Sequence, residues 1–132
     1  MSVKTVAAKL QIKPGTSLWT SHPERIEIVG PLPDDARVVA DLGQATAALV
    51  FADAAGAVRA ILDAHHEHLA GPGLLWVAYP KGNRADINRD SLWPILAEYG
   101  MRPIGQVAVD EVWSALRFRP LKEGEAQFTG GR

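Results

Sequence analysis

Residues with useful chemistry follow several segments of this sequence that are apolar enough to form strands. They are Ser21, His22, Asp53, Lys81, Asp110, Glu111 and Trp113. In an open parallel sheet, ligands bind beyond the carboxyl ends of the strands, near the point where the strand order reverses. A hydroxyl, an imidazole, carboxylates, an ammonium and an indole would meet along that edge. This set suits a small polar or anionic ligand, with Lys81 as the charge and Trp113 as a stacking wall.

Each of these residues also has an ordinary structural interpretation. Asp53 stands where a helix N-cap is expected, and the pair Asp110 and Glu111 is typical of a tight turn. Lys81 suits a solvated loop, and Trp113 within a strand suits the core. Only their convergence on one edge favours a binding site, so the arrangement of the strands decides the question.

The histidines favour neither a metal site nor hydrolytic chemistry. His65, His66 and His68 lie late in a predicted helix, and the run H-H-E-H lacks the four-residue separation of the H-E-x-x-H zinc motif. Imidazoles are well tolerated at a helix C-terminus, so we expect a solvated helix end and no metal site. Ser21 and His22 are adjacent and lack a G-x-S-x-G turn, which argues against a nucleophile and its base. The sequence therefore assigns no catalytic residue.

The apolar segments predict a mostly parallel sheet. Strands are expected over residues 16–20, 37–40, 47–52 and 74–79. The last two are apolar without alternation, as expected of strands that are covered on both faces. Two further strands, over 104–109 and 112–118, are so close in sequence that they predict an antiparallel hairpin.

Helical patterns lie before and between these strands. A short helix is expected at the N-terminus and a long one over residues 54–70. A third should start around Asn88 or Asp90 and stop at Gly100, with a cap as late as Ser91 if Pro94 is to lie in the first helical turn. Residues 23–30 fit a strand or a short helix, and the flanking proline and glycine favour the helix. The result is a three-layer α/β sandwich with a Rossmann-like sheet and a C-terminal antiparallel hairpin strand.

Length and composition limit the classes of function. The chain has 132 residues, no cysteine, 47% hydrophobic residues and a net charge of -1. We expect one domain over residues 1–120 and a flexible polar tail over 121–132. No apolar run approaches the ~20 residues that a bilayer requires, so we expect a cytoplasmic protein without membrane contact. The near-neutral charge, and arginines without an aromatic stacking pattern, predict no nucleic-acid binding.

Several short motifs of the chain occur in the same order in a known family. They are Lys9-Leu10 with Ile12-Lys13-Pro14-Gly15, Gly30-Pro31-Leu32-Pro33, Pro72-Gly73-Leu74-Leu75-Trp76-Val77 with Pro80-Lys81, and Asp110-Glu111 with Trp113-Ser114. On these motifs the sequence resembles an uncharacterised bacterial family, the domain of unknown function 3052, over residues 9–119. The resemblance implies a Rossmann-like fold and no established activity. More distantly, the order of elements resembles the C-terminal half of class I S-adenosylmethionine methyltransferases.

The turn after the first strand departs from the methyltransferase pattern. Those enzymes need a glycine-rich turn there, because the cofactor approaches the backbone too closely for side chains. Here the turn reads Thr20-Ser21-His22-Pro23. Asp41 is the acidic residue that would follow the next strand and hold a ribose, and one aspartate there is weak support. We therefore expect no cofactor.

Together these features predict a non-catalytic, Rossmann-like domain of a bacterial protein that binds a small ligand or a protein partner at the carboxyl edge. One alternative is a minimal, methyltransferase-like transferase with Asp110 or Glu111 as general base. Another is a structural subunit that forms a homodimer or pairs with another protein. A pocket near Ser21, Lys81 and Asp110 would favour binding, whereas a filled edge with a large apolar surface elsewhere would favour assembly.

Overall fold

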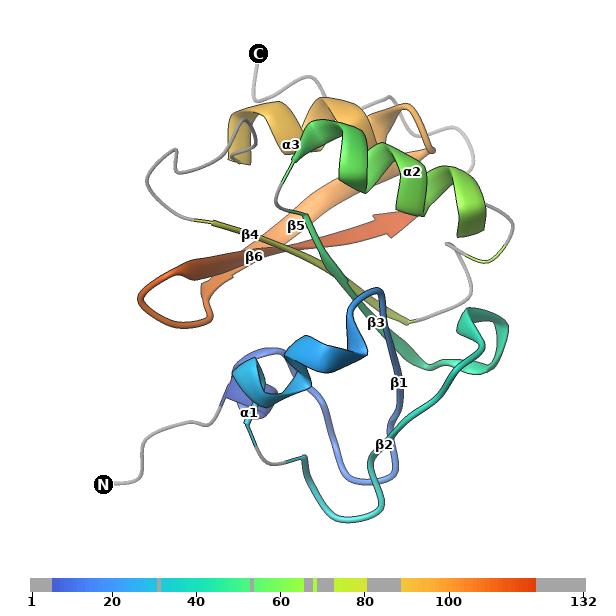
Figure 1. Ribbon diagram of the computed structural model, residues 1–132, viewed down its shortest axis with the longest axis vertical. Coiled ribbons are helices and arrows are strands. Elements are labelled where there is room, and N and C mark those ends of the chain that lie inside the picture. Colours follow the sequence, from blue (N-terminus) through green and yellow to red (C-terminus); the bar gives the residue numbers. More distant parts are fainter. Residues whose placement is uncertain are drawn as a thin grey trace.

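A single six-stranded sheet runs through the molecule in the order β2-β1-β3-β4-β6-β5 (Figure 1). The computed structural model describes residues 6–30, 32–52, 54–65, 68, 73–80 and 89–120. The strands are β1 (Ser17–Thr20), β2 (Arg37–Val38), β3 (Ala47–Phe51), β4 (Leu74–Pro80), β5 (Met101–Ala108) and β6 (Trp113–Pro120). The predicted tail over 121–132 lies outside the described residues.

The strand directions confirm the predicted topology. Strands β2, β1, β3 and β4 are parallel to one another, whereas β6 is antiparallel to both β4 and β5. All five residues of β3 are buried, as are six of the seven in β4. Their continuous apolar sequence therefore reflects a sheet that is covered on both faces.

The helices form the two outer layers. The helices α2 (Ala55–His65) and α3 (Arg89–Ala97) lie on one face, and α1 (Val6–Lys9) and the 3-10 helix η1 (Pro23–Ile28) lie on the other (Figure 1). Val58 and Leu92 pack into the first apolar cluster, and Leu10 and Val29 pack into the second. The fold is thus the predicted three-layer sandwich, with a thinner layer on the side of α1 and η1.

Three local details differ from or refine the prediction. Residues 23–28 are helical, as favoured, but form a 3-10 helix. α3 begins at Arg89, as expected, but Pro94 lies inside the helix instead of in its first turn, so the alternative of a cap at Ser91 was wrong. Pro94 is on the exposed side of the helix, where the carbonyl that loses its amide partner can be hydrated. A second 3-10 helix, η2 (Leu42–Gln44), was not predicted, and its N-cap is Asp41.

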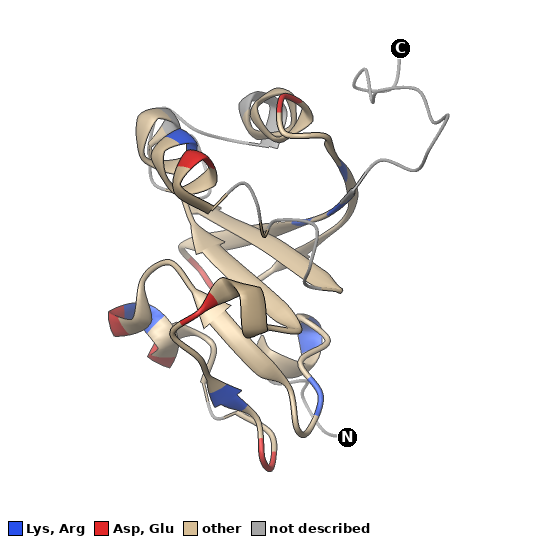
Figure 2. Cartoon of the chain, turned by 90° about the vertical axis from the view of Figure 1, so that its right-hand side faces the viewer, with Lys and Arg blue, Asp and Glu red and all other residues tan. Residues whose placement is uncertain are grey.

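Charged side chains surround the sheet without entering its centre. Figure 2 shows them on helices, loops and other strands of the sheet, while β3 and β4 contain none. Arg59 and Glu98 join α2 to the end of α3 at 2.7 Å, and this hydrogen-bonded pairing lowers the pKa of Glu98. The Tyr99 hydroxyl donates to Asp63 Oδ1 at 2.6 Å, which raises the pKa of Tyr99.

No helix among the described residues has the length and apolar character needed to cross a bilayer.

A buried hydrogen bond ties the N-terminal segment to the middle of the sheet. The Trp76 indole on β4 donates to the Leu10 carbonyl at 2.9 Å. Both residues are buried, Leu10 completely. This bond fixes the end of α1 over the face on which η1 also lies.

Replacing Trp76 with phenylalanine is expected to lower the free energy of unfolding by about 2 kcal/mol. The Leu10 carbonyl would be left unpaired in the interior, and the smaller ring would leave space. Urea unfolding followed by far-ultraviolet circular dichroism measures the change. The control Ile104→Val, at a side chain that is 42% exposed, should stay within about 0.5 kcal/mol of the wild type. Equal losses in the two variants would contradict the role of the hydrogen bond.

Candidate functional site

The strand order reverses between β1 and β3. From β1 the chain passes to β2 on one side and later to β3 on the other. In sheets of this kind, the crevice beyond the carboxyl ends at such a point is where ligands bind. The two strands that border it here end at Thr20 and Phe51.

Ser21 spans this crevice with its side chain. Its Oγ accepts the backbone N–H of Phe51 at 2.9 Å, and its own N–H donates to the Leu49 carbonyl at 3.1 Å. The same Oγ lies 2.7 Å from His22 Nδ1, and the backbone N–H of His22 donates to Thr20 Oγ1 at 3.3 Å. A hydroxyl therefore joins the ends of β1 and β3 at the turn where a methyltransferase has glycine.

Two aromatic rings and a guanidinium pack beside Ser21 and His22. Phe51 is almost fully buried, and its ring meets those of Trp113 and His22 edge to face, at centroid distances of 5.4 and 6.0 Å. The guanidinium carbon of Arg25 lies 5.6 Å from the Phe51 ring and 5.4 Å from the Trp113 ring. Such cation–π contacts hold a half-buried arginine in place at the carboxyl edge.

Arg25 is the residue of this group that the sequence analysis missed. The sequence feature that could have pointed to Arg25 is the short helix favoured over residues 23–30, because that helix places Arg25 about one turn beyond β1. Its contacts with Phe51 and Trp113 join segments far apart in sequence, and no local pattern reports them.

The hairpin turn delivers Trp113 to the same cluster. Asp110 Oδ1 accepts the backbone N–H groups of Val112 at 2.8 Å and Trp113 at 2.7 Å, which is the turn role considered above. Glu111 is exposed in this turn. Trp113 packs against the apolar cluster under η1 yet stays half-buried, so it serves as both core and surface residue.

The structure thus brings part of the predicted site together. Ser21, His22 and Trp113 meet around Phe51, with Asp110 in the turn that holds Trp113. Lys81 directly follows β4 and Asp53 comes shortly after β3, but both lie outside the described residues. We call the group Ser21, His22, Arg25, Phe51 and Trp113 the carboxyl-edge cluster.

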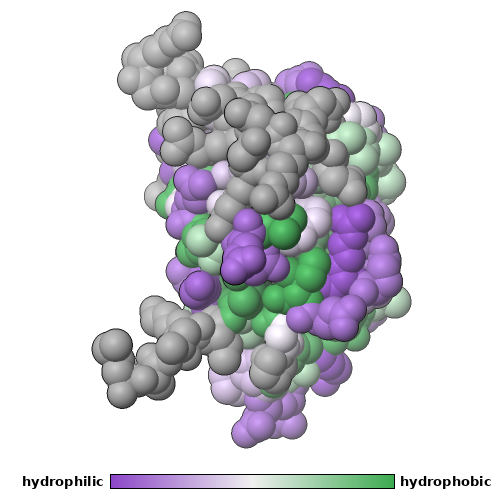
Figure 3. All heavy atoms as spheres, turned by 60° about the vertical axis from the view of Figure 1, so that its left-hand side comes forward, coloured by the Kyte–Doolittle hydropathy of each residue, from purple (hydrophilic) through white to green (hydrophobic). Residues whose placement is uncertain are grey.

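The surface on this side is mixed in character. Figure 3 brings forward the side of the molecule with the hairpin turn, and apolar atoms gather in the middle of that face with hydrophilic atoms beside them. Val112, in the turn, is 39% exposed. A face of this kind can hold a ligand that has both an apolar part and a charged group.

The described histidines and acidic residues form no cluster of three potential metal ligands. His65 meets Trp19 edge to face, with ring centroids 4.7 Å apart. Asp41, the residue considered for a ribose, accepts the Gly43 N–H at 2.9 Å and caps η2. His66 and Glu67 lie outside the described residues.

In sequence, the chain matches no protein-family model and no curated protein, so the resemblance to the domain of unknown function 3052 is not confirmed. In structure, it is similar to a Streptococcus agalactiae protein of the NADB-Rossmann superfamily, with a TM-score of 0.55 and 11% identity over 98% of this chain and 72% of that chain. It is also similar to TrmK, the m1A22 tRNA methyltransferase of B. subtilis, with a TM-score of 0.56 and 14% identity over 96% of this chain and 71% of that chain.

A further similar structure is Streptococcus pneumoniae Sp1610 in complex with S-adenosyl-L-methionine. Its TM-score is 0.56 at 11% identity, over 98% of this chain and 77% of that chain. At these identities the likeness shows the fold alone. That fold is a Rossmann-like domain of the kind found in methyltransferases, and the match spans nearly the whole of this chain.

Replacing Ser21 with alanine should lower the free energy of unfolding by about 1–3 kcal/mol, because the Phe51 N–H would lose its acceptor in a buried position. Native-state hydrogen exchange should show the Phe51 amide exchanging faster, and more so than that of Val50. The control is Ser17→Ala on the same strand, where the recorded hydrogen bonds of Ser17 use its backbone. Unchanged exchange at Phe51 in Ser21→Ala would show that the hydroxyl does not join the two strands.

Proposed function

We propose that this protein is a non-catalytic, Rossmann-like domain that binds a small anionic ligand at its carboxyl edge. The observation that carries the proposal is the convergence of Ser21, His22, Arg25 and Trp113 around Phe51, next to the point where the strand order reverses. Ligands of Rossmann-like sheets bind in that position.

The chemistry of the cluster supports an anion. Arg25 has planar, always-charged N–H donors that match a carboxylate or phosphate group, and packing against two rings orients them. The half-buried His22 adds a second ring nitrogen, Nε2, beyond the one that contacts Ser21. The half-buried face of Trp113 suits an apolar or planar part of the ligand. Lys81 and Asp53, which follow adjacent strands, are proposed to complete the site, with Glu111 at its margin.

The geometry gives less support to a reaction. Ser21 Oγ already accepts an amide proton and contacts His22, so it has a structural role at the strand ends. Asp110, the residue considered as a general base, has Oδ1 bonded to two backbone N–H groups. Both side chains therefore position the cluster, and binding is the simpler function for it.

S-adenosylmethionine binding, as in a minimal transferase, is the second candidate. It is favoured by the likeness to a structure solved with that ligand. The Ser21 side chain argues against it, because it occupies the turn that the cofactor approaches through glycine in those enzymes. The two candidates thus differ in which added compound should stabilise the protein.

A thermal-shift titration with citrate, inorganic phosphate, adenosine monophosphate and S-adenosylmethionine separates them. A small anion should raise Tm by several degrees, because a ligand at about 100 times its Kd adds about 2.7 kcal/mol. S-adenosylmethionine should leave Tm unchanged. The variant Arg25→Met should bind the stabilising anion about tenfold more weakly, through loss of a charge-assisted hydrogen bond.

The control for that titration is Arg59→Met, an equal change of charge on the exposed side of α2. It should bind the anion as the wild type does. If Arg25→Met keeps the full rise in Tm, the anion binds at another place on the protein. If no anion raises the Tm of the wild type, the binding proposal is refuted. A Tm rise with S-adenosylmethionine alone would favour the transferase.

A further inference from the structure

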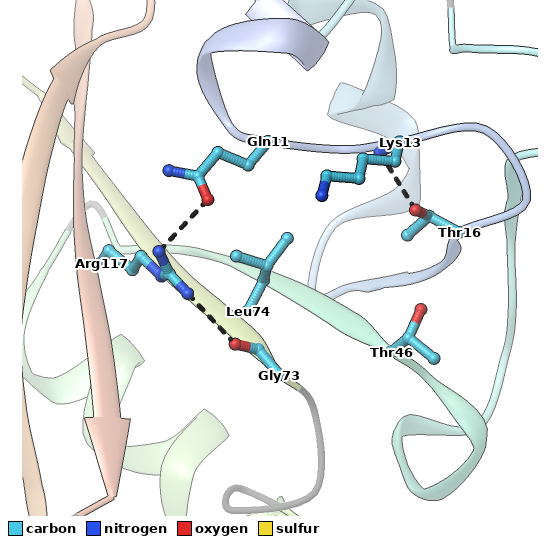
Figure 4. A pocket seen from close by; sticks show the side chains of 7 residues that line it. All are labelled: Gln11, Lys13, Thr16, Thr46, Gly73, Leu74 and Arg117. Carbon is cyan, nitrogen blue, oxygen red and sulfur yellow. Dashed lines mark hydrogen bonds between the residues drawn. The ribbon is translucent and has the colours of Figure 1, made fainter.

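A second site lies at the opposite edge of the sheet, where the parallel strands begin. A cavity of about 330 Å³ opens there, and Figure 4 shows its lining side chains. Thr16 and Thr46 stand directly before β1 and β3, Leu74 begins β4, and Arg117 comes from β6. No member of the carboxyl-edge cluster lines it.

Among the described residues, those that line the cavity include two cations and no carboxylate. Lys13 comes from the loop between α1 and β1, and Arg117 from the far side of the cavity. In Figure 4 the charged ends of both side chains reach toward the space between them. Two like charges held near one space repel each other, and a bound anion would relieve that repulsion.

Arg117 is held in a fixed orientation by neutral acceptors. Its Nη1 donates to Gln11 Oε1 at 3.2 Å and its Nη2 to the Gly73 carbonyl at 3.4 Å (Figure 4). The Nε atom is buried and has no hydrogen-bond partner among the described residues. A half-buried guanidinium with these partners keeps an uncompensated charge, and each Nη atom has a second N–H left to donate.

Gln11 occupies a position that usually favours glycine. It follows α1 with a φ of 60°, and the Ile12 N–H closes the helix end on the Ala7 carbonyl at 2.9 Å. A glycine would adopt this conformation without steric conflict. The glutamine instead supplies the oxygen that orients Arg117, which is a reason for its presence at a strained position.

Thr16 adds a donor of a different kind. Its Oγ1 accepts the Lys13 backbone N–H at 3.1 Å, which leaves the hydroxyl proton available to a ligand. Thr46 instead uses its hydroxyl on the backbone of Ser17, accepting at 3.1 Å and donating at 3.4 Å, and so shapes the wall. Lys13, Gly73 and Leu74 belong to two of the sequence motifs given above, and these two motifs contain no member of the carboxyl-edge cluster.

We propose that this cavity binds the phosphate group of a small phosphate monoester. The ammonium and the hydroxyl come from the loop before β1 and the guanidinium from β6, and donors on two sides suit a tetrahedral group with several oxygens better than a planar carboxylate. The two cations match the charge of a phosphate monoester, close to -2 at neutral pH. The volume exceeds that of the phosphate alone, and Leu74 provides apolar contact for the attached organic group.

Calorimetric titration of Arg25→Met, in which the carboxyl-edge cluster lacks its guanidinium, with inorganic phosphate, phenyl phosphate and benzoate tests the proposal. Both phosphates should bind, phenyl phosphate more tightly, and benzoate should bind at least about tenfold more weakly. Lys13→Met and Arg117→Met should each weaken phenyl phosphate binding about tenfold. Lys13 is exposed, so its variant stays informative even if Arg117→Met lowers stability.

The matched controls are Lys9→Met and Arg59→Met, which change the charge equally at positions away from this cavity and should bind phenyl phosphate like the wild type. Phosphate binding that is lost in Arg25→Met and kept in Lys13→Met would overturn this inference while supporting the carboxyl-edge site. Equal affinity for benzoate and phenyl phosphate would overturn the phosphate assignment, and no binding of either phosphate at millimolar concentration would overturn the site itself.

Discussion

Two central strands with both faces covered determine where polar chemistry can occur in this protein. β3 and β4 are apolar along their whole length because helices pack on one side of them and the α1–η1 layer on the other. A charged side chain at their centres would be buried without a partner, at a large desolvation penalty. Polar side chains therefore gather beyond the strand ends, and the fold offers two edges for binding.

The two edges differ in how their positive charge is held. At the carboxyl edge, Arg25 lies against the rings of Phe51 and Trp113, and Asp110 fixes the turn that carries Trp113. At the opposite edge, Arg117 is held by an amide oxygen and a backbone carbonyl. At the first edge the aromatic rings suit a planar ligand. The second edge presents separate donors that suit a smaller polar group.

The sequence predicts the elements of this fold better than the contacts between them. β3, β4 and the hairpin have strong local signals, because uninterrupted apolar runs and a short connection leave few alternatives. Pro94 lies inside α3 and not in its first turn as expected, because a proline penalty in a helix depends on whether the affected carbonyl faces water. The meeting of Arg25 with Trp113, and of Gln11 with Arg117, depends on tertiary packing that no spacing in the sequence encodes.

Nuclear magnetic resonance tests most directly whether the carboxyl-edge cluster is a binding surface. The Trp113 indole and the amides of Ser21 and His22 can be followed in the 15N-labelled protein as adenosine monophosphate is added. If the cluster binds the nucleotide, these signals should shift saturably, and the signal of the Val77 amide at the centre of β4 should stay unchanged. Saturable binding that moves other residues and leaves Trp113, Ser21 and His22 in place would contradict it.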